Sequence, residues 1–213
     1  FDGRKEAAKK RVQKLKGAGL IGERKRRVNE PSVLFLQAQG FFALSQGGHL
    51  AGYPKLNETA FEKRAQVSEL TLRHELEVMD VKAALCSAIA DTTLFSIAEF
   101  SPWPRLYQFT ARRSGSAEVL VKPDGFIRIH ENEADGGLSE HTFFLEVDRS
   151  TESLETLALR AGSYNGYYRS GGLALRNGQP ASAYKDFPFR VLMVFKSRER
   201  RDNMAERLLK NNP

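Results

Sequence analysis

The chain has 213 residues, of which 41% are hydrophobic and 28% are charged, a balance typical of a folded protein and not of a disordered one. No apolar segment approaches the ~20 residues of a membrane span, so we expect no membrane association. The single cysteine, Cys86, excludes a disulfide framework and a cysteine-based zinc site, and a cytoplasmic location is the default expectation. Since the first residue is Phe1 and not an initiator methionine, the chain is expected to begin inside a longer protein.

The net charge of +7 is concentrated at the N-terminus. Residues 1–27 contain eleven Lys or Arg and three acidic residues, a net charge of +8, so the other 186 residues together carry −1. Such a basic segment is either a solvated tail or, when it is folded, an electrostatic footprint for nucleic acid.

Residues 4–19 predict an amphipathic helix that ends at Gly17 and Gly19. Ala8, Val12 and Leu15 fall within an arc of ~60° on a helical wheel. Lysines lie beside this arc and along the polar side: Lys5, Lys9, Lys10, Lys14 and Lys16. The pattern therefore predicts one apolar stripe next to a basic face.

The residues that follow predict a β-hairpin and a short helix. The apolar segments at residues 20–21 and 33–36 flank a basic run and a turn at residues 29–32, and residues 38–45 form the helix. This order resembles the second half of a winged-helix domain. The resemblance implies that the first helix enters the major groove of double-stranded DNA. It also places four basic residues in or near the wing: Arg24, Lys25, Arg26 and Arg27. Contact with another protein and a merely solvated basic face are the alternatives.

A long central helix is predicted for residues 58–90, which contain no Gly or Pro, after a linker at residues 46–57. One stripe of this helix has spacings of three and four: Val67, Leu70, His74, Val78, Val81 and Leu85. His74 on this stripe is either a buried histidine with a hydrogen-bond partner or a residue at the edge of an active site.

Residues 117–149 predict two antiparallel strands, the first interrupted at Pro123, around a polar loop at residues 130–140. If the loop is centred on residue 135, the numbers of paired residues sum to 270, and Asp124 faces Glu146 with Cβ atoms ~5 Å apart. Strand alternation then places Asp148 on the same face as Glu146. Two or three carboxylates thus converge.

Converging carboxylates repel one another and lose hydration unless a cation lies between them. A Mg²⁺ or Mn²⁺ ion bound by Asp124 and Glu146 is one solution. An ion pair with Arg149 or Arg160 is the other, and the residues leave both open.

Pro123-Asp124 on one strand, followed about 20 residues later by Glu146 on the next, resembles the PD-(D/E)xK nuclease superfamily. The resemblance implies that Asp124 and Glu146 bind a metal ion that activates water. The superfamily's lysine two residues after the glutamate is replaced here by Asp148. Arg160 on the following helix is the substitute, and because arginine is a poor proton acceptor, we expect weak or no hydrolysis.

The C-terminal elements are predicted to be a helix at residues 152–168, a strand at 189–195 and a helix at 198–210. Arg160 and Tyr164 lie four residues apart on one side of the first of these helices. Tyr164 is interpreted as a packing residue, or as a side chain that touches a phosphate beside a metal ion.

The order of elements is similar to that of the replication-relaxation family of mobile-element proteins. The residues that carry this resemblance are His74, Pro123-Asp124-Gly125, residues 143–149 and Tyr164. It implies an α+β or α/β protein with a winged-helix module at residues 1–46 and a nuclease-like mixed sheet flanked by helices at residues 58–213. The catalytic candidates are Asp124, Glu146, Asp148, Arg149, Arg160, Tyr164 and His74.

The implied function is that of a DNA-binding protein of a plasmid or other mobile element, acting in replication, relaxation or transfer with other proteins of those processes. Two alternatives are an active metal-dependent DNA endonuclease and a winged-helix transcriptional regulator or adaptor. The sequence assigns neither enzymatic activity nor oligomeric state. A Rossmann or P-loop enzyme is excluded, since no Gly-rich phosphate loop joins a strand to a helix.

Overall fold

The computed structural model describes residues 5–24, 29–51, 53, 66–102, 107–112 and 118–210. The chain divides into two compact units, residues 1–69 and 70–213. Within the described ranges, no helix is long and apolar enough to cross a membrane.

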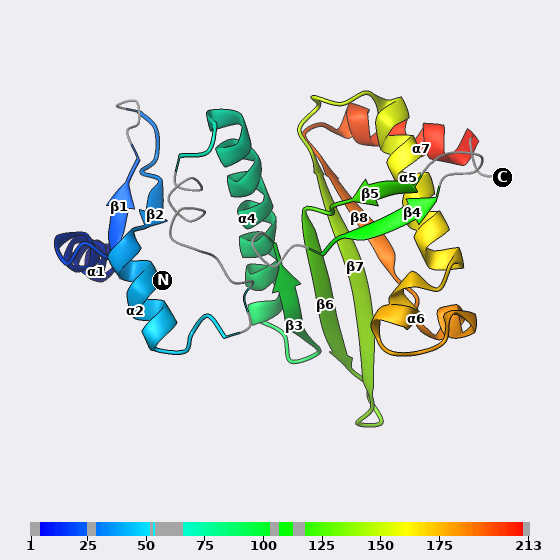
Figure 1. The fold of residues 1–213 in the computed structure, drawn as a ribbon, viewed down its shortest axis with the longest axis horizontal. Coiled ribbons are helices and arrows are strands. Elements are labelled where there is room, and N and C mark those ends of the chain that lie inside the picture. The colour runs from blue at the N-terminus through cyan, green and yellow to red at the C-terminus, as the bar shows by residue number, and fades with distance from the viewer. Residues whose placement is uncertain are drawn as a thin grey trace. The chain divides into compact units, whose positions relative to one another are not determined.

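The N-terminal unit is built from a helix, a β-hairpin and a second helix, in the predicted order (Figure 1). Helix α1 spans Lys5–Gly17, strands β1 and β2 span Ile21–Glu23 and Leu34–Leu36 and pair antiparallel, and α2 spans Ala38–Gln46. Gly40 is needed where α2 passes β1, because a Cβ atom there would lie 2.2 Å from the carbonyl oxygen of Leu20. The basic residues Lys25, Arg26 and Arg27 lie outside the described residues.

The side chains of α1 are largely solvent-exposed. None of its described residues is buried, and Leu15, on the predicted apolar stripe, is 41% exposed. Lys16 forms an ion pair with Glu23 of β1. The Arg24 guanidinium donates a hydrogen bond to the carbonyl oxygen of Val67 at 2.7 Å. Lys9 also pairs with Glu6 of the same helix at 3.2 Å, so at least three of the predicted DNA-contacting residues have partners within the N-terminal unit.

The C-terminal unit contains a four-stranded mixed sheet. Its strands are β3 (Phe95–Ser101), β6 (Gly125–Asn132), β7 (Leu138–Asp148) and β8 (Arg190–Phe195), in the order β3-β6-β7-β8. β6 pairs antiparallel with β3 on one side and with β7 on the other, and β8 runs parallel to β7. The expectation of a mixed sheet is therefore confirmed.

The register of the central hairpin is the one predicted. Gly125 faces Leu145 and Asn132 faces Leu138, so that paired numbers sum to 270. The predicted loop was too long, because the strands run on to Asn132 and begin again at Leu138. The amide of Glu133 donates to the carbonyl oxygen of Gly137 at 2.9 Å, and Gly136 adopts a φ of 84° that favours glycine in this tight turn.

Helices cover both faces of the sheet (Figure 1). Helix α4, Glu69–Ala90, packs Val78 against Ile127 and Leu145 on one face. Helix α5, Leu154–Arg169, packs Tyr164 and other residues against the opposite face, where Phe144 is fully buried.

Three details of the predicted helices were wrong. The central helix begins at Glu69 and not at residue 58, since residues 66–68 are not helical and residues 54–65 lie outside the described part. Leu70, assigned to the inner stripe, is 62% exposed because it lies in the first turn, beyond the sheet-facing residues. The helix predicted at 152–168 begins at Leu154, because Ser153 caps it by accepting a hydrogen bond from the amide of Thr156.

The strand predicted across Pro123 is two strands in different sheets. β5 (Glu118–Val121) pairs with β4 (Phe109–Arg112) in a separate two-stranded sheet, and only β6 joins the mixed sheet. Phe109 of β4 stacks on Tyr167 of α5 with ring centroids 4.0 Å apart. Helix α6 (Gly172–Arg176), the 3₁₀ helix η1 (Ala181–Asp186) and α7 (Arg198–Lys210) complete the unit.

Candidate functional site

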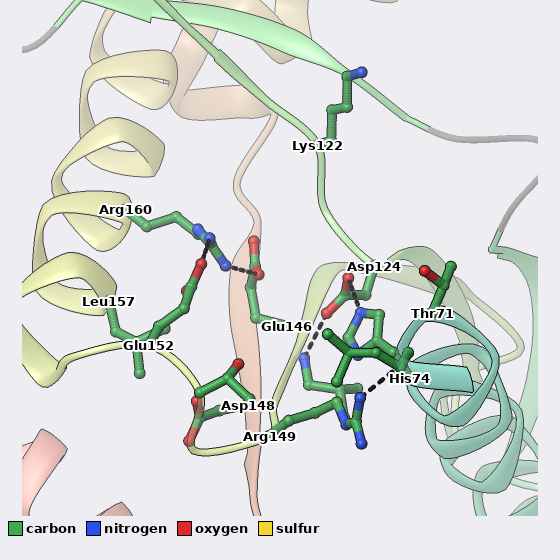
Figure 2. Close-up of a pocket in the computed structure, with 13 residues that line it drawn as sticks. Thr71, His74, Lys122, Asp124, Glu146, Asp148, Arg149, Glu152, Leu157 and Arg160 are labelled. Carbon is green, nitrogen blue, oxygen red and sulfur yellow. Dashed lines mark hydrogen bonds and ion pairs between the residues drawn. The ribbon is translucent and has the colours of Figure 1, made fainter. Parts of the chain in front are cut away.

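A pocket of about 340 Å³ lies within the C-terminal unit, where α4, the start of β6, the end of β7 and the start of α5 meet (Figure 2). Six of the seven catalytic candidates line it: His74, Asp124, Glu146, Asp148, Arg149 and Arg160. The seventh, Tyr164, is buried and donates a hydrogen bond to Glu146. The structure therefore brings residues from four separate segments of the sequence together.

Asp124 is held at the start of β6 by contacts to both of its carboxylate oxygens. Oδ2 accepts a hydrogen bond from the amide of Val147 at 2.7 Å, and Oδ1 lies 2.7 Å from Nε2 of His74. The hydrogen bond to Asp124 raises the pKa of His74, because it stabilises the protonated imidazole. The other ring nitrogen, Nδ1, is buried and has no hydrogen-bond partner among the described residues. His74 thus lies at the pocket, paired with a carboxylate.

Glu146 is buried on β7, with an exposed fraction of 3%. Its Oε1 accepts a hydrogen bond from the Tyr164 hydroxyl at 2.5 Å, and its Oε2 accepts one from Nη1 of Arg160 at 2.9 Å. Burial raises the pKa of Glu146 to about 7, although Arg160 and Tyr164 both act to lower it. Burial also raises the pKa of Tyr164, so its hydroxyl remains a donor.

The two arginines proposed as partners for the carboxylates have different roles. Arg160 donates to Glu146 and also to Oε1 of Glu152 at 2.8 Å. Arg149 instead lies with its Nε 3.0 Å from Oε2 of Glu77 on α4, and its Nη1 donates to the carbonyl oxygen of Leu70. Arg160 is therefore the cation that holds Glu146, and Arg149 links the end of β7 to α4.

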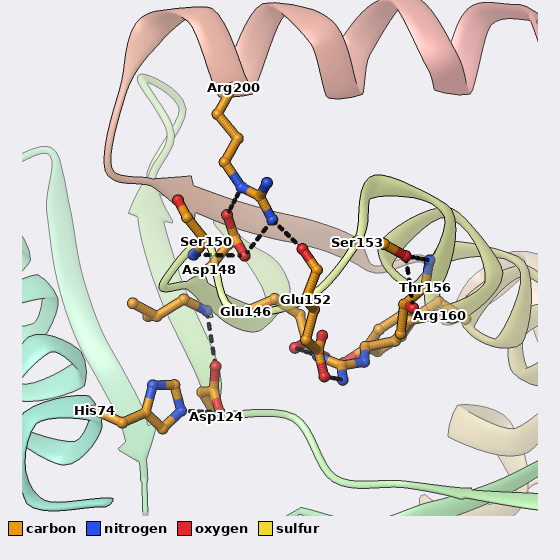
Figure 3. Close-up of polar contacts among 12 residues, drawn as sticks. His74, Asp124, Glu146, Asp148, Ser150, Glu152, Ser153, Thr156, Arg160 and Arg200 are labelled. Atoms are coloured by element: carbon orange, nitrogen blue, oxygen red, sulfur yellow. Dashed lines mark hydrogen bonds and ion pairs between the residues drawn. The ribbon is translucent and has the colours of Figure 1, made fainter. Parts of the chain in front are cut away.

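Asp148, two residues after Glu146, is buried and bound by Arg200 of α7 (Figure 3). Nη2 of Arg200 donates to Oδ1 of Asp148 at 3.0 Å and to the carbonyl oxygen of Glu152 at 2.5 Å. The amide of Ser150 donates to the same Oδ1 at 3.1 Å. Ser150 adopts a φ of 62°, a left-handed conformation consistent with this tight turn onto Asp148.

These contacts bear on the expected divalent ion. All four carboxylate oxygens of Asp124 and Glu146 are in contact with protein donors or the His74 ring nitrogen. Mg²⁺ and Mn²⁺ bind carboxylate oxygens directly, so an ion would have to share these oxygens with the groups that already contact them. Within the described ranges, no three His, Cys, Asp or Glu side chains group to hold a metal. Arg160 supplies the positive charge beside Glu146.

Sequence reasoning missed three residues of this region. Lys122 lines the pocket two residues before Asp124, although Figure 2 shows its ammonium group pointing away from that carboxylate. Its closeness to Asp124 in the sequence was a usable signal. Arg200 carried no such signal, because its contacts depend on the parallel pairing of β7 with β8, which places Phe195 opposite Asp148. Glu152 carried none either, since its contacts are to Arg160 and Arg200 on two different helices.

The fold and the pocket define a two-unit protein with a mixed α/β C-terminal unit and a pocket of paired carboxylates and arginines. The family model named replication-relaxation matches residues 1–180 of the chain. The chain belongs to this family, which connects it with the replication and relaxation of mobile elements. No curated protein matches the chain, and neither does a solved structure.

Proposed function

We propose that the protein binds double-stranded DNA of a plasmid or other mobile element through its N-terminal unit, and acts there in replication, relaxation or transfer. The observation that carries this proposal is the basic helix α1. Lys5, Lys9 and Lys10 are all exposed on it, in a segment that holds the chain's whole excess of positive charge. Exposed lysines on a helix neutralise phosphates and release the counterions bound to them.

The order α1, hairpin, α2 supports a winged-helix arrangement in which α1 is the recognition helix and the β1–β2 connection is the wing. Lys16 and Arg24 have partners within the unit, Glu23 and the carbonyl of Val67. Lys9 pairs with Glu6, but both side chains remain largely exposed, at 72% and 77%. We therefore assign the main phosphate contacts to Lys5, Lys9 and Lys10.

For the C-terminal unit we propose a nuclease-like domain in which hydrolysis is weak or absent. The support is the pairing of every carboxylate oxygen of Asp124 and Glu146, together with the ion pair between Asp148 and Arg200 where a lysine would act. In this role the unit contacts other replication or transfer proteins. The alternative is an active metal-dependent endonuclease, which the presence of Lys122 at the same pocket favours.

The proposal is tested by fluorescence anisotropy of a labelled DNA duplex titrated with the full chain at several salt concentrations. We expect binding whose dissociation constant rises with salt, with a log–log slope of about 3 if the three lysines each contact one phosphate. Absence of binding at low salt would contradict the proposal. It would instead favour a winged-helix adaptor that recognises protein.

A further inference from the structure

A second group of exposed cations lies at the end of α5 that is remote from the pocket. Leu157 and Arg160, in the first half of α5, line the pocket, whereas Arg169 ends the helix roughly 14 Å further along its axis. Helix α6 and η1 follow and pack together there, since a Cβ atom on Gly171 would lie 2.4 Å from the carbonyl oxygen of Ala181. Figure 1 shows α6 beside this end of α5. The group is therefore separate from the carboxylate pocket.

These cations lack acidic partners. Residues 169–190 contain four basic residues and one acidic residue, a net charge of +3. Arg169 of α5, Arg176 of α6 and Lys185 of η1 are exposed, and none of them forms an ion pair within the part of the chain that the structure describes. By contrast, four cations of α7 pair with carboxylates: Arg200, Arg201, Arg207 and Lys210. The charge at the end of α5 is thus left for a partner outside the chain.

Arg176 is held against an aromatic ring. Its guanidinium carbon lies 3.6 Å from the centroid of the Tyr107 ring. Tyr107 is fixed in the core, because its ring stacks on Phe126 with centroids 4.6 Å apart and its hydroxyl lies 2.8 Å from that of Tyr167. One face of the planar guanidinium therefore rests on a rigid support. Since Arg176 is exposed, its other face is presented to solvent.

Two further aromatic side chains lie among these cations. Tyr168 of α5 and Tyr184 of η1 meet edge to face with ring centroids 5.1 Å apart, and both are partly exposed. The ammonium of Lys185 lies 6.0 Å from the centroid of the Tyr184 ring. Cations interleaved with planar side chains are typical of surfaces that bind single-stranded nucleic acid, where the cations contact phosphates and the planar groups stack on bases.

We propose that the surface formed by the last turn of α5, by α6 and by η1 binds single-stranded DNA. A base stacks on the outer face of the Arg176 guanidinium, and Arg169 and Lys185 contact neighbouring phosphates. Bases in a duplex are already stacked on one another, so this surface prefers a single strand, unlike the basic helix α1. The connection of the family with replication favours DNA over RNA. An acidic protein segment would match the charges, but the support of Arg176 by Tyr107 favours a strand of bases.

Anisotropy titration of a short labelled oligo(dT) strand at low salt tests this proposal. The full chain carries Lys5→Ala/Lys9→Ala/Lys10→Ala in every sample, so that these lysines of α1 cannot contact the strand. We expect this background chain to bind oligo(dT). Adding Arg169→Ala/Arg176→Ala should weaken binding by about tenfold or more, because one stacked base and one phosphate contact are lost.

The matched control adds Arg198→Ala/Arg201→Ala to the same background, which removes two exposed arginines from α7. This control should bind oligo(dT) as the background does. No binding of oligo(dT) by the background chain, or equal losses in the two arginine variants, would overturn the proposal. Duplex binding by the wild-type chain is a separate measurement, so failure here leaves the proposed role of α1 intact.

Replacement of Arg176 by lysine tests the stacking. Arg176→Lys keeps the charge but lacks the planar guanidinium. It should bind oligo(dT) at least fivefold more weakly, with an unchanged salt slope, and should bind an abasic strand of the same length as the background does. Urea denaturation of each variant checks that the fold survives the change beside Tyr107. Unchanged affinity for oligo(dT), or equal weakening on both strands, would contradict a base stacked on Arg176.

Discussion

The burial of Glu146 between Arg160 and Tyr164 couples its ionisation to folding. Its pKa is about 7 in the folded chain, against an ordinary value of 4.5. Between these two pH values the folded state holds a proton that the unfolded state has lost. This residue's contribution to stability is therefore full below pH 4.5 and declines as the pH rises to about 7.

Glu146→Gln is expected to remove this pH dependence, because an amide has nearly the shape of the carboxyl group and does not ionise. Through Glu146, the free energy of unfolding of the wild type should fall by about 3 kcal/mol from pH 4.5 to pH 8. The variant should lack this fall. The measurement is urea denaturation of both chains at the two pH values. Glu199→Gln, at an exposed carboxylate on α7, is the control and should leave the wild-type difference unchanged. An unaltered pH dependence in Glu146→Gln would show that this carboxyl is not protonated on folding.

At the scale of residues, local spacing predicted part of the site. The centre of the hairpin loop predicted the pairing register that places Asp124 near Glu146. The four-residue spacing predicted that Arg160 and Tyr164 lie on one side of α5, where both bind Glu146. The partners of Asp148 and Arg149 could not be predicted this way. Arg200 reaches Asp148 from 52 residues away, and Glu77 comes from a helix on the other face of the sheet.

At the scale of elements, α7 is fastened to the end of β7 by the contact between Arg200 and Asp148 (Figure 3). The side chain of Asp148 is 3% exposed, so its charge depends on this contact and on the amide of Ser150. Without Arg200, the buried carboxylate of Asp148 would keep one hydrogen-bond donor among the described residues, the amide of Ser150.

Arg200→Ala is expected to lower the free energy of unfolding by about 2–3 kcal/mol. Asp148→Asn combined with Arg200→Ala should cost less than the sum of the two single changes, because the double variant leaves no unpaired charge. Arg201→Ala, which removes an exposed arginine paired with its neighbour Asp202, is the control and should cost less than about 0.5 kcal/mol. The cycle is measured by urea denaturation. If the losses in the free energy of unfolding from the two single changes add up to the loss in the double variant, Asp148 and Arg200 do not stabilise the contact between α7 and the end of β7.

Elements with a continuous hydrophobic period were predictable from the sequence. The helices α1, α2 and α7 and the hairpin of β6 and β7 lie where their patterns placed them. The break between β5 and β6 was not predicted in full, because Pro123 shows that a ladder is interrupted but not that the two halves join different sheets. The sheet assignment of β5 depends on its pairing with β4, a segment without a distinctive pattern.

At the scale of the whole molecule, charge and chemistry are divided between the two units. The excess positive charge lies in residues 1–27, whereas the pocket of carboxylates and arginines lies in residues 70–213. This division supports binding by one unit and a different role for the other.

Hydrolysis of DNA by the C-terminal unit is expected to be slow or absent. Loss of one transition-state stabiliser typically costs ~10²–10³-fold in rate, and the usual lysine position holds Asp148. The assay incubates supercoiled and linear DNA with Mg²⁺ or Mn²⁺ and compares wild type with Asp124→Ala and Glu146→Ala. Rapid nicking that both variants lose would identify a working nuclease and refute this expectation.

The measurement that tests the central claim most directly locates the DNA contact. The variant Lys5→Ala/Lys9→Ala/Lys10→Ala is compared with Lys185→Ala/Arg198→Ala/Lys210→Ala, which removes the same charge from exposed positions of the C-terminal unit. In salt-dependent anisotropy titrations, the first variant should bind at least tenfold more weakly, with a slope lower by about 2–3, while the second binds as wild type. Wild-type affinity and slope in the α1 variant, with weakened binding in the second, would contradict the assignment of DNA binding to the N-terminal unit.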